Sequence, residues 1–350
     1  MNTPWSSRPN RLSAVGDRPG RARYRAGAPG STRSAPRGAG KPEVVPRLLR
    51  PLSELLGRRA FCKEVIVLSA RQRGTLCVFL AAVLYSIGGL CITWGGMAIN
   101  GGRTAIALVV IGLYLAATRH KPKMNLWVLV GALAVCGTNI LFSIANKLTT
   151  AANAIVLQFT APIFVILFSI LLFGKRPQKL DLLACGLVLG GVLLFFVDSL
   201  SAGGMLGNIL ALLSGVSYAG VFMMNDMPDS DAISSVFWGD VISAVVGLPF
   251  LGYEAEFTPN VLAPLLVLGI FQVGAAYILL TEGLKTTPPV TASLVSGIEP
   301  VLNPILVAVF YHEMIGPIAL VGAMVVVGSV VLYNVVLARQ TEPSETGGAL

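Results

Sequence analysis

The chain has 350 residues, of which 54% are apolar and 12% are charged, about half the charged fraction of an ordinary soluble domain. Sixteen of its 26 lysines and arginines precede Thr75, where only four of the 17 acids lie. The formal charge of +9 therefore belongs to an N-terminal tail and is no evidence for nucleic-acid binding by a folded domain. The composition also argues against a water-soluble enzyme.

The sequence offers little for metal, nucleotide or covalent chemistry. Its five cysteines form no CxxC pair, and its only histidines are His120 and His312. Gly174-Lys175 lacks the first glycine of a phosphate-binding P-loop. No nucleophile, base and orienting group recur at a plausible spacing. We expect no enzyme activity, no catalytic residue, no metal site and no cofactor, so transport by this chain would run on gradients.

The N-terminal residues are rich in Arg, Pro, Gly and Ser, with too few apolar side chains to offset the entropy of an ordered chain. We expect a disordered basic tail over residues 1–74 and a short C-terminal tail over 338–350. Between them lie ten apolar runs, each near the roughly 20 residues that cross a 30 Å hydrocarbon layer. They cover residues 75–94, 98–118, 125–146, 151–173, 180–197, 206–225, 232–252, 261–282, 290–311 and 316–337. Because strand alternation is missing, they predict an all-α integral membrane protein with ten transmembrane helices.

Basic residues near the ends of the spans indicate the orientation, because lysine and arginine are retained on the cytoplasmic side. With ten spans, the tail and most basic loops fall on one side, carrying Arg119, Lys121, Lys123, Lys175, Arg176, Lys179, Lys285 and Arg339. Lys147 and Arg103 oppose this arrangement. We expect a multi-pass protein of the cell membrane with both termini in the cytoplasm.

The sequence also contains an internal repeat. Shifting it by 138 residues aligns Gly131–Leu194 with Gly269–Leu332 without a gap, and the matches include Lys147 with Lys285, Thr149 with Thr287, and Pro162 with Pro300. Residues 75–197 and 203–337 are then two halves of five helices each. Because five is odd, the second half is inverted relative to the first, which is the architecture of carriers that work by alternating access.

Two segments carry a resemblance to a known family: QFTAPIFVILFSILLFGK, residues 158–175, and SGIEPVLNPILVAVFYHE, residues 296–313. They resemble the paired EamA domains of the drug/metabolite transporter superfamily. In that family each half commonly carries Glu-Pro-Val near the start of its fourth span and an acidic residue at its end. The second half has Glu299-Pro300-Val301 and Glu313, whereas the first has Ala161-Pro162-Ile163 and Lys175. The resemblance implies secondary transport, often export of a metabolite.

Polar residues inside the spans are candidates for the solute pathway, because a charged group there costs at least about 2.5–3.5 kcal/mol. Glu299 lies within the ninth span, with Asn303 one turn later on the same face. Glu299 either contacts solute or carries a proton, or it forms a structural hydrogen bond to a neighbouring helix. Arg103 in the second span either recognises an anionic group, snorkels to the interface, or forms an internal salt bridge.

Uncharged polar and aromatic residues complete this set. A stripe on the third span either lines the pathway or holds helices together; it consists of Asn139, Ser143 and Asn146. Two amides at membrane depth, Gln158 and Gln272, suit a neutral or zwitterionic solute. Two tyrosines, Tyr85 and Tyr218, occupy similar mid-span places in the first and sixth spans. Gly186 and Gly190 form a small-residue face that suits close helix packing within the chain or in a homodimer.

These observations predict a secondary active transporter that moves a small organic metabolite, with amino-acid-like solutes and export as the expected case. Its partners would be the solute and membrane lipid, and no nucleic acid. Two alternatives remain open: a flippase for a lipid-linked intermediate, and a non-transporting membrane scaffold.

Overall fold

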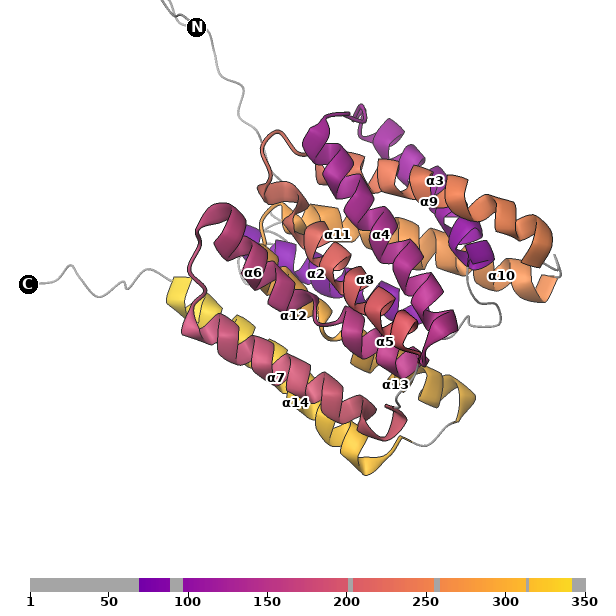
Figure 1. Ribbon diagram of the computed structural model, residues 1–350. Coiled ribbons are helices and arrows are strands. Elements are labelled where there is room, and N and C mark those ends of the chain that lie inside the picture. The colour runs from indigo at the N-terminus through magenta and orange to yellow at the C-terminus, as the bar shows by residue number, and fades with distance from the viewer. Residues whose placement is uncertain (1–68, 89–96, 201–203, 255–258, 313–314, 342–350) are drawn as a thin grey trace, which may run out of the picture. The chain divides into compact units, whose positions relative to one another are not determined.

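A computed structural model describes residues 69–88, 97–200, 204–254, 259–312 and 315–341, and every element in these ranges is helical (Figure 1). Nine helical segments of this part are long and apolar enough to cross a membrane. They agree to within three residues with the second to tenth expected spans and comprise Met97–Ala117, Leu126–Leu148, Ala151–Phe173, Lys179–Ser199, Met205–Asp226, Ala232–Leu251, Leu262–Leu284, Pro289–Phe310 and Pro317–Gln340.

The first expected span begins earlier than the sequence suggested. Helix α2 (Ala70–Ser86) starts after Ser69, whose hydroxyl accepts a hydrogen bond from the Gln72 backbone N–H at 3.2 Å. The Gln72 side chain in turn accepts from the Ser69 N–H at 2.8 Å, a capping box that fixes the start of a helix. Placing residues 70–74 in the tail was therefore wrong, and the remainder of the expected span after residue 88 lies outside the described residues.

The two expected tails otherwise fall largely outside the described residues, which exclude 1–68 and 342–350. At the C-terminal end, helix α14 (Pro317–Thr341) continues past the expected boundary at residue 337. Residues 338–341 therefore belong to the last helix and not to a tail.

Two expected spans are each interrupted halfway. The fourth consists of α5 (Ala151–Gln158) and α6 (Ala161–Phe173), and the ninth consists of α12 (Pro289–Ser296) and α13 (Glu299–Tyr311). A proline occupies the second position of each following helix, Pro162 and Pro300. Because proline has no backbone N–H, it cannot continue the hydrogen bonds of the preceding segment. The two breaks occupy nearly corresponding places in the two halves.

The eighth span is irregular in another way. Helix α10 (Pro259–Val267) leads into a π-helical stretch, η6 (Leu268–Ala275), which continues as α11 (Ala276–Leu284). A π-helical turn widens the helix locally and often accompanies a functional residue. Here it contains Gln272.

The helices pack in pairs that join the two halves (Figure 1). Helix α3 (Met97–Ala117) packs on α9 (Ala232–Glu254), α4 (Leu126–Leu148) packs on α8 (Met205–Met223), and α2 packs on α11. Helix α7 (Lys179–Phe196) lies along α14, and the two run side by side in Figure 1. Each of these pairs takes one helix from each half, so the halves are interleaved.

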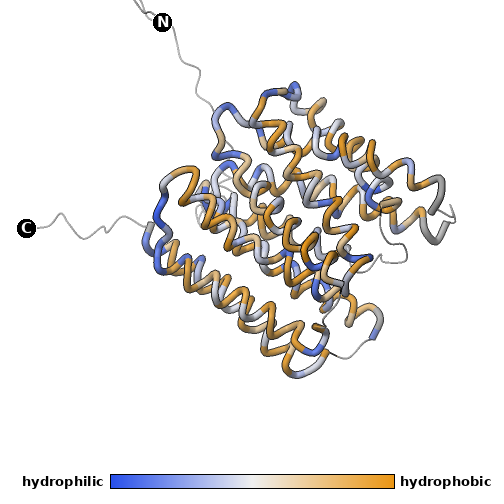
Figure 2. Tube along the Cα trace, viewed as in Figure 1, coloured by the Kyte–Doolittle hydropathy of each residue, from blue (hydrophilic) through white to orange (hydrophobic). Residues whose placement is uncertain are grey.

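The outer surface of the helices is apolar, as a membrane protein requires. Figure 2 shows hydrophobic residues along the lengths of the helices and hydrophilic ones concentrated at their ends. Large apolar side chains are widely exposed, among them Val109 at 63% and Leu113 at 66%. Contiguous exposed apolar surface on this scale suits contact with lipid.

Close packing of α7 on α14 depends on two glycines. A Cβ added at Gly191 would lie 2.7 Å from Val326 Cγ2 and 3.0 Å from the Gly322 carbonyl oxygen. At the expected packing positions Gly186 and Gly190, an added Cβ meets nothing within 4 Å. Within the chain it is therefore Gly191, and not the Gly186 and Gly190 face, that contacts α14.

We expect Gly191→Val to destabilise the protein by about 1–3 kcal/mol, because an overpacked contact forces the backbones of α7 and α14 apart. Gly190→Val makes the same chemical change one residue away in open space and should leave the melting temperature nearly unchanged. Thermal unfolding in detergent measures both. An equal fall in the melting temperature of both variants would show that the close contact of Gly191 with α14 is not the cause of the destabilisation.

Candidate functional site

A cavity lies among the helices where the interrupted segments meet. Its volume is about 70 Å³. Of the residues expected from the sequence, it is lined by Tyr85, Arg103, Asn139, Gln158, Tyr218, Gln272 and Glu299. The lining also includes Thr138, Phe142, Val273 and Tyr277. Residues far apart in the sequence, from both halves of the chain, thus converge on one polar interior site.

The two helix breaks bring Gln158 and Glu299 to the cavity. Gln158 is the last residue of α5, and Glu299 is the first residue of α13. In transporters, the ends of interrupted helices at membrane depth commonly form solute sites, because their backbone groups are free of helical partners. Here the backbone N–H groups at the breaks still donate to the preceding turn, among them those of Phe159 and Gly297, so it is the Gln158 and Glu299 side chains that reach the cavity.

The Glu299 carboxylate has one side-chain partner. The Tyr218 hydroxyl donates to Glu299 Oε2 at 3.5 Å, a long hydrogen bond. The Ser86 hydroxyl donates to the Glu299 backbone carbonyl at 3.4 Å and to the Ala82 carbonyl at 2.8 Å. Glu299 is therefore tethered to α8 and α2, and its carboxylate keeps acceptor capacity toward the cavity.

Arg103 lies on the cavity wall and is held by amides. Its Nη1 donates to Gln272 Oε1 at 3.3 Å, and its Nη2 donates to Asn100 Oδ1 at 3.3 Å. Within the part of the chain that the structure describes, its Nε is buried without a hydrogen-bond partner. The sequence left three possibilities for Arg103: recognition of an anionic group, snorkelling to the interface, or an internal salt bridge. Bonding to two amides inside the protein is neither snorkelling nor a direct salt bridge. The guanidinium instead presents unused donors inside the protein.

Aromatic rings form another part of the wall. The rings of Tyr85 and Tyr277 meet edge to face with centroids 5.5 Å apart. The ring centroids of Tyr218 and Phe222 lie 4.6 Å apart. The Tyr85 hydroxyl is buried without a hydrogen-bond partner among the described residues. Ring faces in such a wall attract cations. Tyr277 was not expected from the sequence, although it lies 138 residues after Asn139 and so corresponds to it in the repeat.

Three expected residues do not line the cavity. The Ser143 hydroxyl donates to the Asn139 carbonyl at 2.7 Å, and Asn146 Nδ2 donates to the Phe142 carbonyl at 3.1 Å. Both side chains thus bond to their own helix. Asn303, one turn beyond Glu299 in α13, is also absent from the lining residues. Of the expected stripe on α4, only Asn139 reaches the cavity.

Asp240 is a buried acid to which the sequence analysis gave no role. It lies in α9, is 0% exposed, and neither of its carboxylate oxygens has a hydrogen-bond partner. Arg103 on the adjacent helix α3 is the positive charge that acts on it.

The described residues include no group of three or more His, Cys, Asp or Glu side chains placed to hold a metal ion. The site is therefore described by its charges, amides and aromatic rings. These groups suit binding of a polar organic molecule.

Comparison with known proteins agrees with this picture. A model of the EamA-like transporter family matches residues 72–197 and 205–335. An uncharacterized transporter of Bacillus subtilis, YwfM, is 29% identical over 238 residues, covering 64% of this chain and 79% of the relative. An uncharacterized transporter of Clostridium kluyveri is 25% identical over 293 residues, covering 75% and 94%.

A solved crystal structure of a protein superposes with a TM-score of 0.66 at 19% sequence identity. The match covers 75% of this chain and 98% of that one. At this identity the likeness supports the fold alone.

Proposed function

This chain belongs to the EamA-like transporter family of the drug/metabolite transporter superfamily, and on that premise we propose that it is a gradient-driven carrier for a small zwitterionic, amino-acid-like metabolite. Ten spans form two inverted halves, both termini lie in the cytoplasm, and the carrier works by alternating access in the direction of export. The central cavity is the solute site.

The helix pairing supports the inverted halves. If the first five spans exchange places with the second five, the pair α2 with α11 becomes the pair α8 with α4, and both pairs are present. The pairs α3 with α9 and α7 with α14 exchange into themselves. Such a pseudo-twofold relation gives two equivalent states, open to opposite sides of the membrane, around one central site.

The orientation rests on where the basic residues lie. Lys175 and Arg176, at the α6–α7 connection, line the same hollow as Arg71 near the start of α2. Leu337 near the end of α14 also lines it, so both ends of the membrane domain lie at this basic side. Because basic ends are retained in the cytoplasm, this side is the inner one.

The solute class rests on one observation: Arg103 and Glu299 both line the cavity and are bonded to neutral partners, not to each other. A solute with a carboxylate and an ammonium group would pair with both. Its carboxylate would receive the guanidinium donors of Arg103, and its ammonium would meet Glu299 and the tyrosine rings.

The test is counterflow in proteoliposomes with three related solutes: an amino acid, the amine left by its decarboxylation, and the acid left by its deamination. We expect exchange of the amino acid alone, because each analogue leaves Arg103 or Glu299 without its partner. If the amine exchanges as fast as the amino acid, Arg103 does not bind the solute. Failure of every solute with folded protein would favour the flippase or the scaffold.

A further inference from the structure

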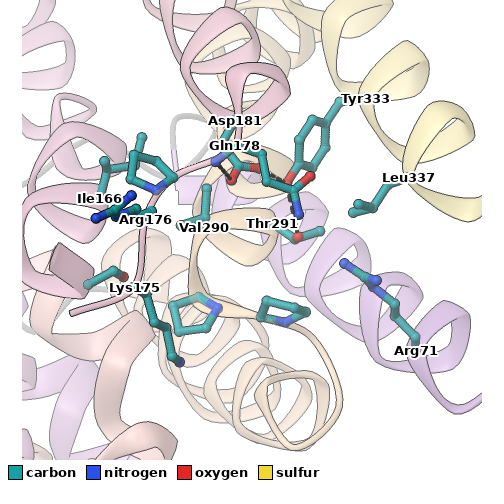
Figure 3. Close-up of a pocket in the computed structure, with 14 residues that line it drawn as sticks. Arg71, Ile166, Lys175, Arg176, Gln178, Asp181, Val290, Thr291, Tyr333 and Leu337 are labelled. Atoms are coloured by element: carbon teal, nitrogen blue, oxygen red, sulfur yellow. Dashed lines mark hydrogen bonds between the residues drawn. The ribbon is translucent and has the colours of Figure 1, made fainter. Parts of the chain in front are cut away.

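A second hollow, separate from the central cavity, lies at the basic ends of the helices. Its volume is about 180 Å³, and Figure 3 shows side chains from α2, α6, α7, α12 and α14 around it. It is larger than the central cavity. None of its lining residues lines the central cavity, so solute binding there does not account for it.

Three cationic side chains surround this hollow. Lys175 and Arg176 come from the α6–α7 connection, and Arg71 comes from the first turn of α2 on the other side (Figure 3). The Lys175 ammonium pairs with Asp226 at 2.7 Å, but the Lys175 side chain is 59% exposed. Because an exposed ion pair of this kind contributes little, Lys175 can exchange Asp226 for another anion.

Asp181 is the one carboxylate among the described residues around the hollow, and both its oxygens are already bonded. The Tyr333 hydroxyl donates to Oδ1 at 2.8 Å, and the Gln178 backbone N–H donates to Oδ2 at 3.0 Å. Asp181 is thereby held at the start of α7. Asp181 and the Asp226 that pairs with Lys175 balance two of the three positive charges, so the groups described around the hollow keep a net positive charge.

The rest of the wall is partly polar, with Ser169, Gln178, Thr291 and Tyr333, and partly apolar. Ile166, Val290 and Leu337 line the hollow beside three prolines. On the two helices that flank it, α7 and α14, Leu183 and Leu332 are 61% and 59% exposed. An amphiphile would bury its apolar part against these apolar side chains, a gain that is not open to a soluble anion.

We propose that this hollow binds the phosphate of an anionic phospholipid, with the glycerol and acyl groups against the apolar side chains of the wall and along α7 and α14. Guanidinium and ammonium groups are the preferred partners of phosphate oxygens. Basic pockets between membrane helices at the cytoplasmic side are suited to such headgroups. This assignment requires only that the chain spans a membrane, and it stands apart from the solute proposed for the central cavity.

The experiment measures binding of phosphatidylglycerol to the full chain by native mass spectrometry, with phosphatidylcholine and inorganic phosphate as comparison ligands. The test variant is Lys175→Ala/Arg176→Ala. The control is Lys121→Ala/Lys123→Ala, which removes two exposed positive charges from the α3–α4 connection. We expect wild type and control to bind phosphatidylglycerol alike and more tightly than phosphatidylcholine, and the test variant to bind it roughly tenfold more weakly.

Two results would overturn the proposal. Equal weakening in both variants would mean that general surface charge, and not this hollow, attracts the lipid. Displacement of phosphatidylglycerol by inorganic phosphate at equal concentration would mean that the site takes a soluble phosphate. Arg176→Gln, a milder change at an exposed side chain, should show the same trend as the double variant if that variant folds poorly.

Discussion

Replacing Glu299 with glutamine is expected to reduce exchange of the solute about ten- to a hundredfold, the loss that corresponds to one hydrogen bond to a charged group. Glutamine has nearly the same shape and can still accept the hydrogen bond that the Tyr218 hydroxyl donates to Oε2. The substitution therefore removes the negative charge and the ability to bind a proton while keeping the packing of α13 against α8. Transport is then expected to lose its pH dependence.

The matched control is Glu282→Gln at the end of α11. Glu282 accepts from Lys285 at 2.5 Å and from the Tyr114 hydroxyl at 2.7 Å, away from the central cavity. Because this is a partly exposed pair, its loss should affect transport little. Counterflow in proteoliposomes at several pH values compares the two variants with wild type. If Glu299→Gln exchanges solute as wild type does, Glu299 serves only the hydrogen bond to Tyr218.

The positions of the spans could be predicted from the sequence because insertion into lipid depends on composition summed over about 20 residues. The start of α2 at Ala70 could not be predicted in this way, since it depends on the hydrogen bonds of Ser69 and Gln72 and not on hydropathy. The breaks after Gln158 and Ser296 were missed for a related reason. A proline in a membrane helix is tolerated either with or without an interruption, so Pro162 and Pro300 alone do not distinguish the two.

The site was predictable where a side chain is polar, lies deep in a span and cannot bond to its own helix. Glu299 and Gln158 meet these conditions and line the cavity. Arg103 lines it too, although it lies near the start of its span and also donates to Asn100 of its own helix. Ser143 shared the polarity and depth of Glu299 and Gln158, but a serine hydroxyl can donate to the carbonyl four residues earlier, and it does so. Asp240 was given no role from the sequence, because only the packing of α3 on α9 brings it near the positive charge of Arg103.

The pair formed by Arg103 and Asp240 leads to the second large effect. Asp240 is fully buried and its oxygens accept no hydrogen bond from the described residues. The positive charge of Arg103 opposes the cost of burying its negative charge. Arg103→Met keeps a long side chain but leaves Asp240 uncompensated. Arg103→Met also leaves the Gln272 and Asn100 side-chain oxygens without the donors that Arg103 supplies. A buried polar group left unpaired costs about 1–3 kcal/mol, and we expect the melting temperature of Arg103→Met to fall accordingly.

Asp240→Asn should cost much less and should restore part of the stability when it is combined with Arg103→Met. The double variant is then more stable than Arg103→Met alone, which is the signature of coupling between the two positions. Thermal unfolding of the four proteins in one detergent measures this cycle. If the two losses simply add, Arg103 acts only through Gln272 and Asn100, and Asp240 would have to be stabilised as a neutral acid by its apolar surroundings alone. Arg103 lies on α3 and Asp240 on α9, helices from different halves that pack on each other. A positive coupling would therefore mean that this electrostatic interaction contributes to the contact between the two halves.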